Sequence, residues 1–140
     1  MHIFEKRAGK VLLLKVCGRL YSKTVPSFER ELARHLEGGV SELGLDLENL
    51  HGVNSAGLRA LQAVALRLEA AGGKLAFCAC GELLRDTLAR SGLCANAQLF
   101  HSLEDSLDFF GLPPGDGDWV RTQMPDEESE VTIVAPDGRS

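Results

Sequence analysis

Short apolar runs alternate with helix-like segments along the first 111 residues, and this alternation narrows the choice of fold more than any other feature. The runs at 11–16 and 74–80 are long enough for buried strands. In the segment 55–71, by contrast, apolar residues recur at the spacing of one helical face. Strands that alternate with helices predict an α/β fold, with a mixed, mostly parallel sheet under helical cover.

Glycines and capping residues divide this part of the chain into nine expected elements. The expected strands are residues 2–7, 11–16, 43–47, 74–80 and 98–101. The expected helices begin near Pro26, Ser55, Glu82 and Ser102, and they end near Glu37, Ala71, Ser91 and Phe110. Thr24 and Ser102 are the expected caps of the first and last helix, and residues 51–54 are expected to be a short connection. The predicted order is therefore β-β-α-β-α-β-α-β-α, with about four helices.

Residues 112–140 differ from the rest of the chain in charge. They carry seven acidic side chains against two basic ones, whereas residues 1–111 carry thirteen of each sign. Their Pro, Gly and acidic residues predict a flexible C-terminal tail after a single domain over residues 1–111. One strand-like run, 131–135, is able to add to a sheet edge in this chain or in a neighbour, which opens a route to self-association. A neutral domain with an acidic tail lacks the basic face that nucleic-acid binding needs.

The apolar stretches and the cysteines predict a cytoplasmic protein. No stretch reaches the roughly 18 apolar residues of a membrane span, so no direct membrane insertion is expected. The first seven residues lack the apolar segment of a secretion signal. The four cysteines stand among apolar residues and do not form a secreted-type framework. Cys78 and Cys80 are expected on one face of a strand, where they are interpreted as core packing and not as a redox or metal pair.

The motifs of common enzyme classes are missing from the sequence. It has no Gly-rich phosphate loop and no Gly-x-Ser-x-Gly elbow. Its four histidines do not fall at metal-ligand spacing. We therefore predict no catalytic residue, no metal ligand and no cofactor, and interpret the chain as a binding module and not as an enzyme. Binding of a small ligand in an apolar pocket stays open as a further class of function.

The candidate site lies at residues 45–61, where a strand leads through a short loop into a helix. The first N–H groups of that helix have no internal partner, and Asn54 or Ser55 can accept from them as a cap. Gly57 has no side chain, so another backbone can approach the first turn closely. This helix end would also favour an anion such as a phosphate on a serine. Taken alone, however, an Asn-Ser pair before a helix is an ordinary cap.

This junction resembles the signature of the STAS domains, the family of bacterial anti-sigma-factor antagonists. The family pattern is an apolar strand ending in Asp, a short apolar loop, and Asp-Ser-Ser-Gly-Leu at the start of a helix. The corresponding segments here are residues 45–47, 50–53 and 54–58. The turns at 16–20 and 71–75 also resemble those of the family, and the likeness covers about residues 2–111. The resemblance implies a single STAS-like domain over residues 1–111.

The resemblance implies a regulatory switch and not catalysis. In the family, the unmodified protein binds a serine kinase of the histidine-kinase-like ATPase fold that is also an anti-sigma factor. Phosphorylation of a serine at the start of the second helix then breaks the complex. By this resemblance, we expect an exposed partner-binding surface made of Tyr21, Ser22, Lys23, Asn54, Ser55, Ala56, Gly57, Leu58 and Arg59.

The sequence departs from the family pattern at the modified position. The family's phosphoserine falls on Ala56, which has no hydroxyl, and its aspartate falls on Asn54. Ser55 is then the phosphorylation candidate, although a shift of one residue turns its side chain by about 100° around the helix. Tyr21 stands where the family often has Asp. Ala56 favours an alternative, a non-phosphorylated STAS subunit of a larger complex such as a signalling scaffold or a lipid-transport ATPase.

Overall fold

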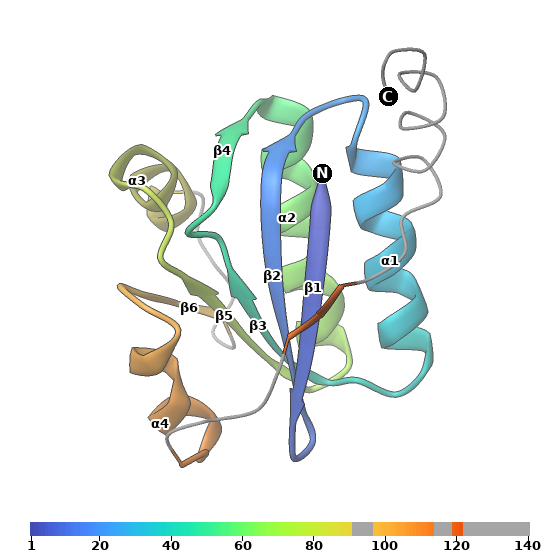
Figure 1. The fold of residues 1–140 in the computed structure, drawn as a ribbon, viewed down its shortest axis with the longest axis vertical. Coiled ribbons are helices and arrows are strands. Elements are labelled where there is room, and N and C mark those ends of the chain that lie inside the picture. The colour runs from blue at the N-terminus through green and yellow to red at the C-terminus, as the bar shows by residue number, and fades with distance from the viewer. Residues whose placement is uncertain (91–96, 114–118, 122–140) are drawn as a thin grey trace.

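A seven-stranded mixed sheet forms the centre of the structure, a computed structural model that describes residues 1–90, 97–113 and 119–121 (Figure 1). The strands are β1 (His2–Ala8), β2 (Val11–Leu20), β3 (Glu42–Asp46), β4 (Leu50–Val53), β5 (Lys74–Cys78), β6 (Ala97–Phe100) and β7 (Val120–Arg121). The helices are α1 (Val25–Glu37), α2 (Ser55–Ala70), α3 (Glu82–Arg90) and α4 (Leu107–Phe110), and a 3-10 turn at Glu104–Ser106 precedes the last of them. This arrangement confirms the predicted α/β fold with a mixed, mostly parallel sheet and four helices.

The strand order across the sheet is β6-β5-β3-β2-β1-β7, and β4 pairs with β2 off this path. β1 and β2 form an antiparallel hairpin, whose turn contains Gly9 at a φ of +62°. β2, β3, β5 and β6 run parallel to one another. The helices between them return the chain to the end of the sheet at which these strands begin. Every residue of β3 is buried, as expected for a central strand that is covered on both faces.

Two apolar cores hold helices against the two faces of the sheet. The larger core lies beneath α1 and α2, and the helical faces predicted from apolar spacing supply it through Phe28, Leu32, Leu61 and Leu68. The smaller core lies on the opposite face, and its fully packed residues are Val11, Leu13, Ala76, Cys78 and Phe110. With both faces covered, the ends of the strands and the helix termini are left to form a site.

Residues 51–54, predicted to be a short connection, instead contain most of a strand. β2 continues to Leu20, beyond its expected end at residue 16, and β4 pairs with this extension in parallel. The register shifts between Gly18 and Arg19, and Gly18 has a φ of +110°, so the pairing depends on an irregular backbone. The observed element order therefore contains one more strand between the first and second helix than we predicted.

The two predicted helix caps differ in how their hydroxyls are used. Ser102 accepts a hydrogen bond from the backbone N–H of Asp105 at 3.1 Å, but it does not cap α4, because the 3-10 turn at Glu104–Ser106 lies between them and Ser106 is the residue before the helix. Thr24 occupies the N-cap position of α1, but its hydroxyl donates to the carbonyl of Arg19 at 2.7 Å. It also accepts from the N–H of Tyr21 at 3.1 Å, so Thr24 braces the β2–α1 loop and does not cap the helix.

Cys78 and Cys80 do not lie on one face of a strand, contrary to the prediction. β5 ends at Cys78, and the next residue, Ala79, has a φ of +59°, which breaks the alternation of side chains. Cys78 packs in the smaller core, whereas Cys80 packs against the larger one. Burial raises the pKa of the Cys78 thiol to about 11 and also raises that of Cys80, so neither is an activated nucleophile.

Contacts of the sheet include residues 119–121, which belong to the segment that we predicted to be a C-terminal tail. β7 pairs antiparallel with β1 at Phe4 and Glu5. The Trp119 ring makes cation–π contacts with two lysines. Lys6 Nζ lies 5.3 Å and Lys15 Nζ 4.7 Å from the ring centroid. The predicted strand-like run at 131–135 and Cys94 lie outside the described residues.

Candidate functional site

The loop after β2 and the start of α2 lie side by side at one end of the sheet, where β2 and β4 both end (Figure 1). The N–H of Asn54 donates to the carbonyl of Leu20 at 3.2 Å. The Asn54 side-chain amide lies 3.5 Å from the Ser22 hydroxyl. The β2–β4 pairing therefore brings together the two segments that the sequence assigned to one surface.

Asn54 is the cap of α2. Its Oδ1 atom accepts from the N–H of Gly57 at 3.0 Å, and its carbonyl accepts from the N–H of Leu58 at 2.9 Å. Its backbone is extended, as an N-cap requires, and the helix begins at Ser55. Of the two cap candidates proposed from the sequence, the structure uses Asn54, which leaves the exposed Ser55 as the first helical residue.

Replacing Asn54 by alanine should lower the free energy of unfolding by about 1 kcal/mol, because the N–H of Gly57 then loses its acceptor. Asn54→Asp should be tolerated, since a carboxylate also caps and is favourable at a helix N-terminus. Urea unfolding followed by circular dichroism would measure both variants. Equal losses for the alanine and aspartate variants would contradict a capping role.

Gly57 is buried, which corrects the expectation that it forms part of an exposed, contactable surface. A Cβ atom at this position would lie 2.2 Å from the Leu20 carbonyl oxygen and 3.0 Å from Val53 Cγ1. The close backbone approach predicted at Gly57 is real, but the approaching backbone belongs to this chain. Gly57 thus positions the surface and is not available to a partner.

The remaining predicted site residues reach solvent to different extents. Those with exposed side chains are Ser22, Lys23, Asn54, Ser55 and Arg59. Those that are half-buried are Tyr21, Ala56 and Leu58. We call these eight residues, together with Arg19, the α2-start surface. Its exposed members come from two segments distant in sequence, so it exists only in the folded chain.

Arg19 belongs to this surface and was missed by the sequence reasoning. It is exposed near the end of β2, opposite Gly52 in the parallel pairing, and its guanidinium lies 5.4 Å from the centre of the Tyr21 ring. The sequence signal that could have found it is a charged residue inside the segment 16–20, whose turn resembles that of the family and directly precedes Tyr21. Segments 18–24 and 51–59 contain Arg19, Lys23 and Arg59 but no acidic residue, so the surface is basic.

Comparison with known proteins agrees with this fold. A family model of the STAS domain matches residues 5–106. The chain belongs to the STAS domain family. No curated protein sequence matches the chain. Among the described residues, none of the helices combines the length and apolar character needed to cross a lipid bilayer.

Solved structures share the fold of this STAS domain at low sequence identity. An anti-sigma factor antagonist from Mycobacterium paratuberculosis is 23% identical, with a TM-score of 0.67 over 76% of this chain and 91% of that one. The Bacillus cell fate determinant SpoIIAA in its phosphorylated form is 18% identical, with a TM-score of 0.65 over 79% and 99%. RsbS of Moorella thermoacetica, carrying a serine-to-glutamate substitution, is 18% identical, with a TM-score of 0.63 over 78% and 94%.

Proposed function

We propose that this STAS domain is a non-enzymatic regulatory module of the cytoplasm that docks through its α2-start surface to a protein of the anti-sigma type. The occupant favoured by the resemblance is a serine kinase of the histidine-kinase-like fold that also acts as an anti-sigma factor. The observation that carries the proposal is the juxtaposition of the Ser22 loop with the exposed Asn54–Ser55 helix start. The two segments are distant in sequence, and their exposed residues lie side by side in the folded chain.

The charge of the surface specifies the partner further. Arg19, Lys23 and Arg59 are exposed, and the segments that carry them contain no acidic residue. A partner with an acidic docking face would therefore associate faster at low ionic strength, because opposite charges steer the encounter. The half-buried Tyr21 ring supplies an apolar and polar contact of the kind that is enriched at the centre of interfaces.

Ser55 is the position at which phosphorylation would switch this interaction. It is exposed and lies in the first turn of α2, where a phosphate would be favoured by the helix dipole. A phosphate brings about −1.5 to −2 charges into a closely packed interface, and desolvation and repulsion then oppose binding. The structural neighbours include one protein solved in a phosphorylated form and another with a serine replaced by glutamate, which supports a switch of this kind.

Replacing Ser55 by aspartate should weaken partner binding at least about tenfold, or roughly 1.4 kcal/mol. The folded domain should tolerate the change, because an acid in the first helical turn is favourable. Gln98→Glu is the matched control, since it adds the same charge to an exposed residue on β6, far along the strand order. Calorimetry with a purified anti-sigma kinase would compare the three proteins. Equal affinities would place the interface elsewhere.

Incubation with that kinase and ATP separates the switch from the alternative. Addition of one phosphate, mapped to Ser55 by peptide mass and absent in Ser55→Ala, is the result expected for the switch. The alternative is a permanently non-phosphorylated STAS subunit of a signalling scaffold or a lipid-transport ATPase. One specific observation favours it, since Ala56 holds the family's phosphoserine position and has no hydroxyl. Stable binding without any mass increment would support that alternative.

A further inference from the structure

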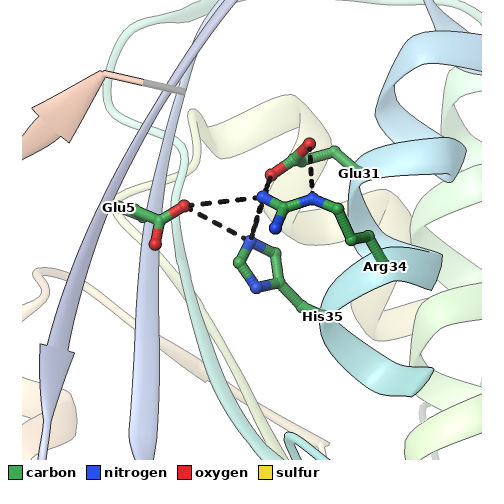
Figure 2. A network of polar contacts seen from close by, with 4 residues as sticks. All are labelled: Glu5, Glu31, Arg34 and His35. Carbon is green, nitrogen blue, oxygen red and sulfur yellow. Dashed lines mark hydrogen bonds and ion pairs between the residues drawn. The ribbon is translucent and has the colours of Figure 1, made fainter. Parts of the chain in front are cut away.

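A cluster of four polar side chains joins β1 to α1 on the face of the sheet that α1 covers (Figure 2). Glu31 and His35 are four residues apart on α1 and therefore project from the same side of the helix. Glu5 projects toward them from β1, and Arg34 reaches into the group from the next position on the helix. The cluster thus combines one imidazole, two carboxylates and one guanidinium.

The imidazole of His35 and the carboxylate of Glu31 are buried at the centre of this cluster. The side chain of His35 is 4% exposed and that of Glu31 is 9% exposed, whereas Glu5 is 28% exposed. Two carboxylates and one guanidinium surround the imidazole. Buried charges are stabilised by pairing or by coordination of a metal ion. A cation held between the two carboxylates would therefore be stabilised here.

The spacing of the donor atoms fits a divalent metal ion. His35 Nε2 lies 3.1 Å from Glu31 Oε2 and 3.4 Å from Glu5 Oε1, and one atom from each of the three residues lies within 4.8 Å of the others. Bonds of about 2.0–2.1 Å from a tetrahedral zinc ion to nitrogen and oxygen place neighbouring ligands roughly 3.3 Å apart. The two distances to the imidazole therefore match a zinc coordination shell with little movement.

The Arg34 guanidinium is the cation that contacts all three of these side chains in the structure. Its guanidinium pairs with Glu31, lies 3.8 Å from Glu5 Oε1, and lies 3.4 Å from His35 Nε2. One imidazole nitrogen cannot donate to the carboxylates and accept from the guanidinium at the same time. Because the Arg34 side chain is 60% exposed, it can swing into solvent when another cation takes its place.

We propose that Glu5, Glu31 and His35 form a binding site for a divalent transition metal of the zinc class, with Arg34 as a displaceable cation. His35 contributes a neutral nitrogen, and each glutamate contributes one carboxylate oxygen. Water completes the tetrahedral shell, as at zinc sites with three protein ligands. Metal binding would join β1 to α1 more firmly than the guanidinium does, because all three ligands would bond to one ion.

Calorimetry with Zn²⁺ on the full chain, in a buffer that does not bind the metal, tests the proposal. We expect one equivalent to bind, and both Glu5→Gln and His35→Gln to weaken the affinity at least about tenfold. Arg34→Gln should instead tighten it about tenfold, since it removes a like charge next to the ion. His2→Gln is the matched control, because His2 is an exposed histidine on β1 outside the cluster, and it should leave the affinity unchanged.

Substitution with Co²⁺ identifies the ligands independently of affinity. The visible bands of a tetrahedral Co²⁺ site with nitrogen and oxygen ligands, lost in Glu5→Gln, support the proposal. A sulfur-to-cobalt charge-transfer band would overturn it, because the metal would then be at a cysteine. Absence of Zn²⁺ binding, or unchanged affinity in both ligand variants while their circular dichroism shows a folded protein, would overturn it too. So would an Arg34→Gln variant that binds no more tightly.

Discussion

Replacing Gly57 by alanine should lower the free energy of unfolding by about 2–3 kcal/mol and the melting temperature by about 10 °C. An added Cβ would lie 2.2 Å from the carbonyl oxygen of Leu20 and 3.0 Å from its carbonyl carbon. These are backbone atoms, which cannot move aside as a flexible side chain can. The same carbonyl accepts the hydrogen bond from Asn54 N–H, so displacing it also separates the two halves of the α2-start surface.

The sign of the Gly57 result is as informative as its size. In an unobstructed helix, Gly→Ala stabilises by about 1 kcal/mol, because alanine loses less backbone entropy on folding. Chemical denaturation would therefore distinguish a helix pressed against Leu20 from one that stands clear of it. Gly81→Ala serves as the control for added bulk alone, since Gly81 is exposed directly before α3 and a Cβ there meets nothing within 4 Å, so only the small loss of an N-cap change is expected. A gain in stability for Gly57→Ala would refute the contact.

Replacing Gly73 by alanine should lower the free energy of unfolding by about 3 kcal/mol. An added Cβ would lie 1.9 Å from the carbonyl oxygen of Ser41, just before β3. That oxygen already accepts from the N–H of Lys74 at 2.9 Å, which ties the start of β5 to the start of β3. The substitution would therefore force β5 away from β3 or break this hydrogen bond. Thermal unfolding followed by circular dichroism would measure the loss.

Gly72→Ala separates a steric cause from a conformational one. Gly72 has a φ of +73°, but a Cβ there meets nothing within 4 Å. The Gly72→Ala variant should lose about 1 kcal/mol of its free energy of unfolding, because only the left-handed backbone conformation is unfavourable for alanine. The Gly73→Ala variant should lose clearly more. If the two losses were equal, the close contact at Ser41 would not exist in solution.

The sequence predicted the elements that local periodicity specifies and missed those that distant pairing creates. The apolar face of α2 and the buried run of β5 are readable because each repeats its own period. The strand at residues 50–53 could not be predicted in this way, because His51 and Gly52 interrupt its apolar residues. It forms only by pairing with an irregular extension of β2. β7 has two residues, which is too short for any periodic pattern.

In the candidate site, too, the sequence predicted the local features and missed the contacts between distant segments. Asn54 caps the helix within its own first turn, so local sequence was sufficient. The burial of Gly57 was not predictable, since the backbone that covers it comes from Leu20 in another strand. The spacing of the histidines could not predict the cluster of Glu5, Glu31 and His35, because Glu5 comes from β1 and joins the other two residues only in the folded chain. Local sequence rules describe caps and turns, whereas sites that join distant strands and helices require the fold.

The pairing of β7 with β1 also has a consequence for the state of association. β1 lies next to the end of the strand order, and an uncovered strand at that position is a template for another chain. β7 covers it at Phe4 and Glu5, while the charged Lys6 and Arg7 follow directly along the strand. Charge on an edge strand discourages lateral addition of a foreign strand. The two residues of β7, which lie beyond the family-matched region, thus shorten the part of β1 that is open to another chain.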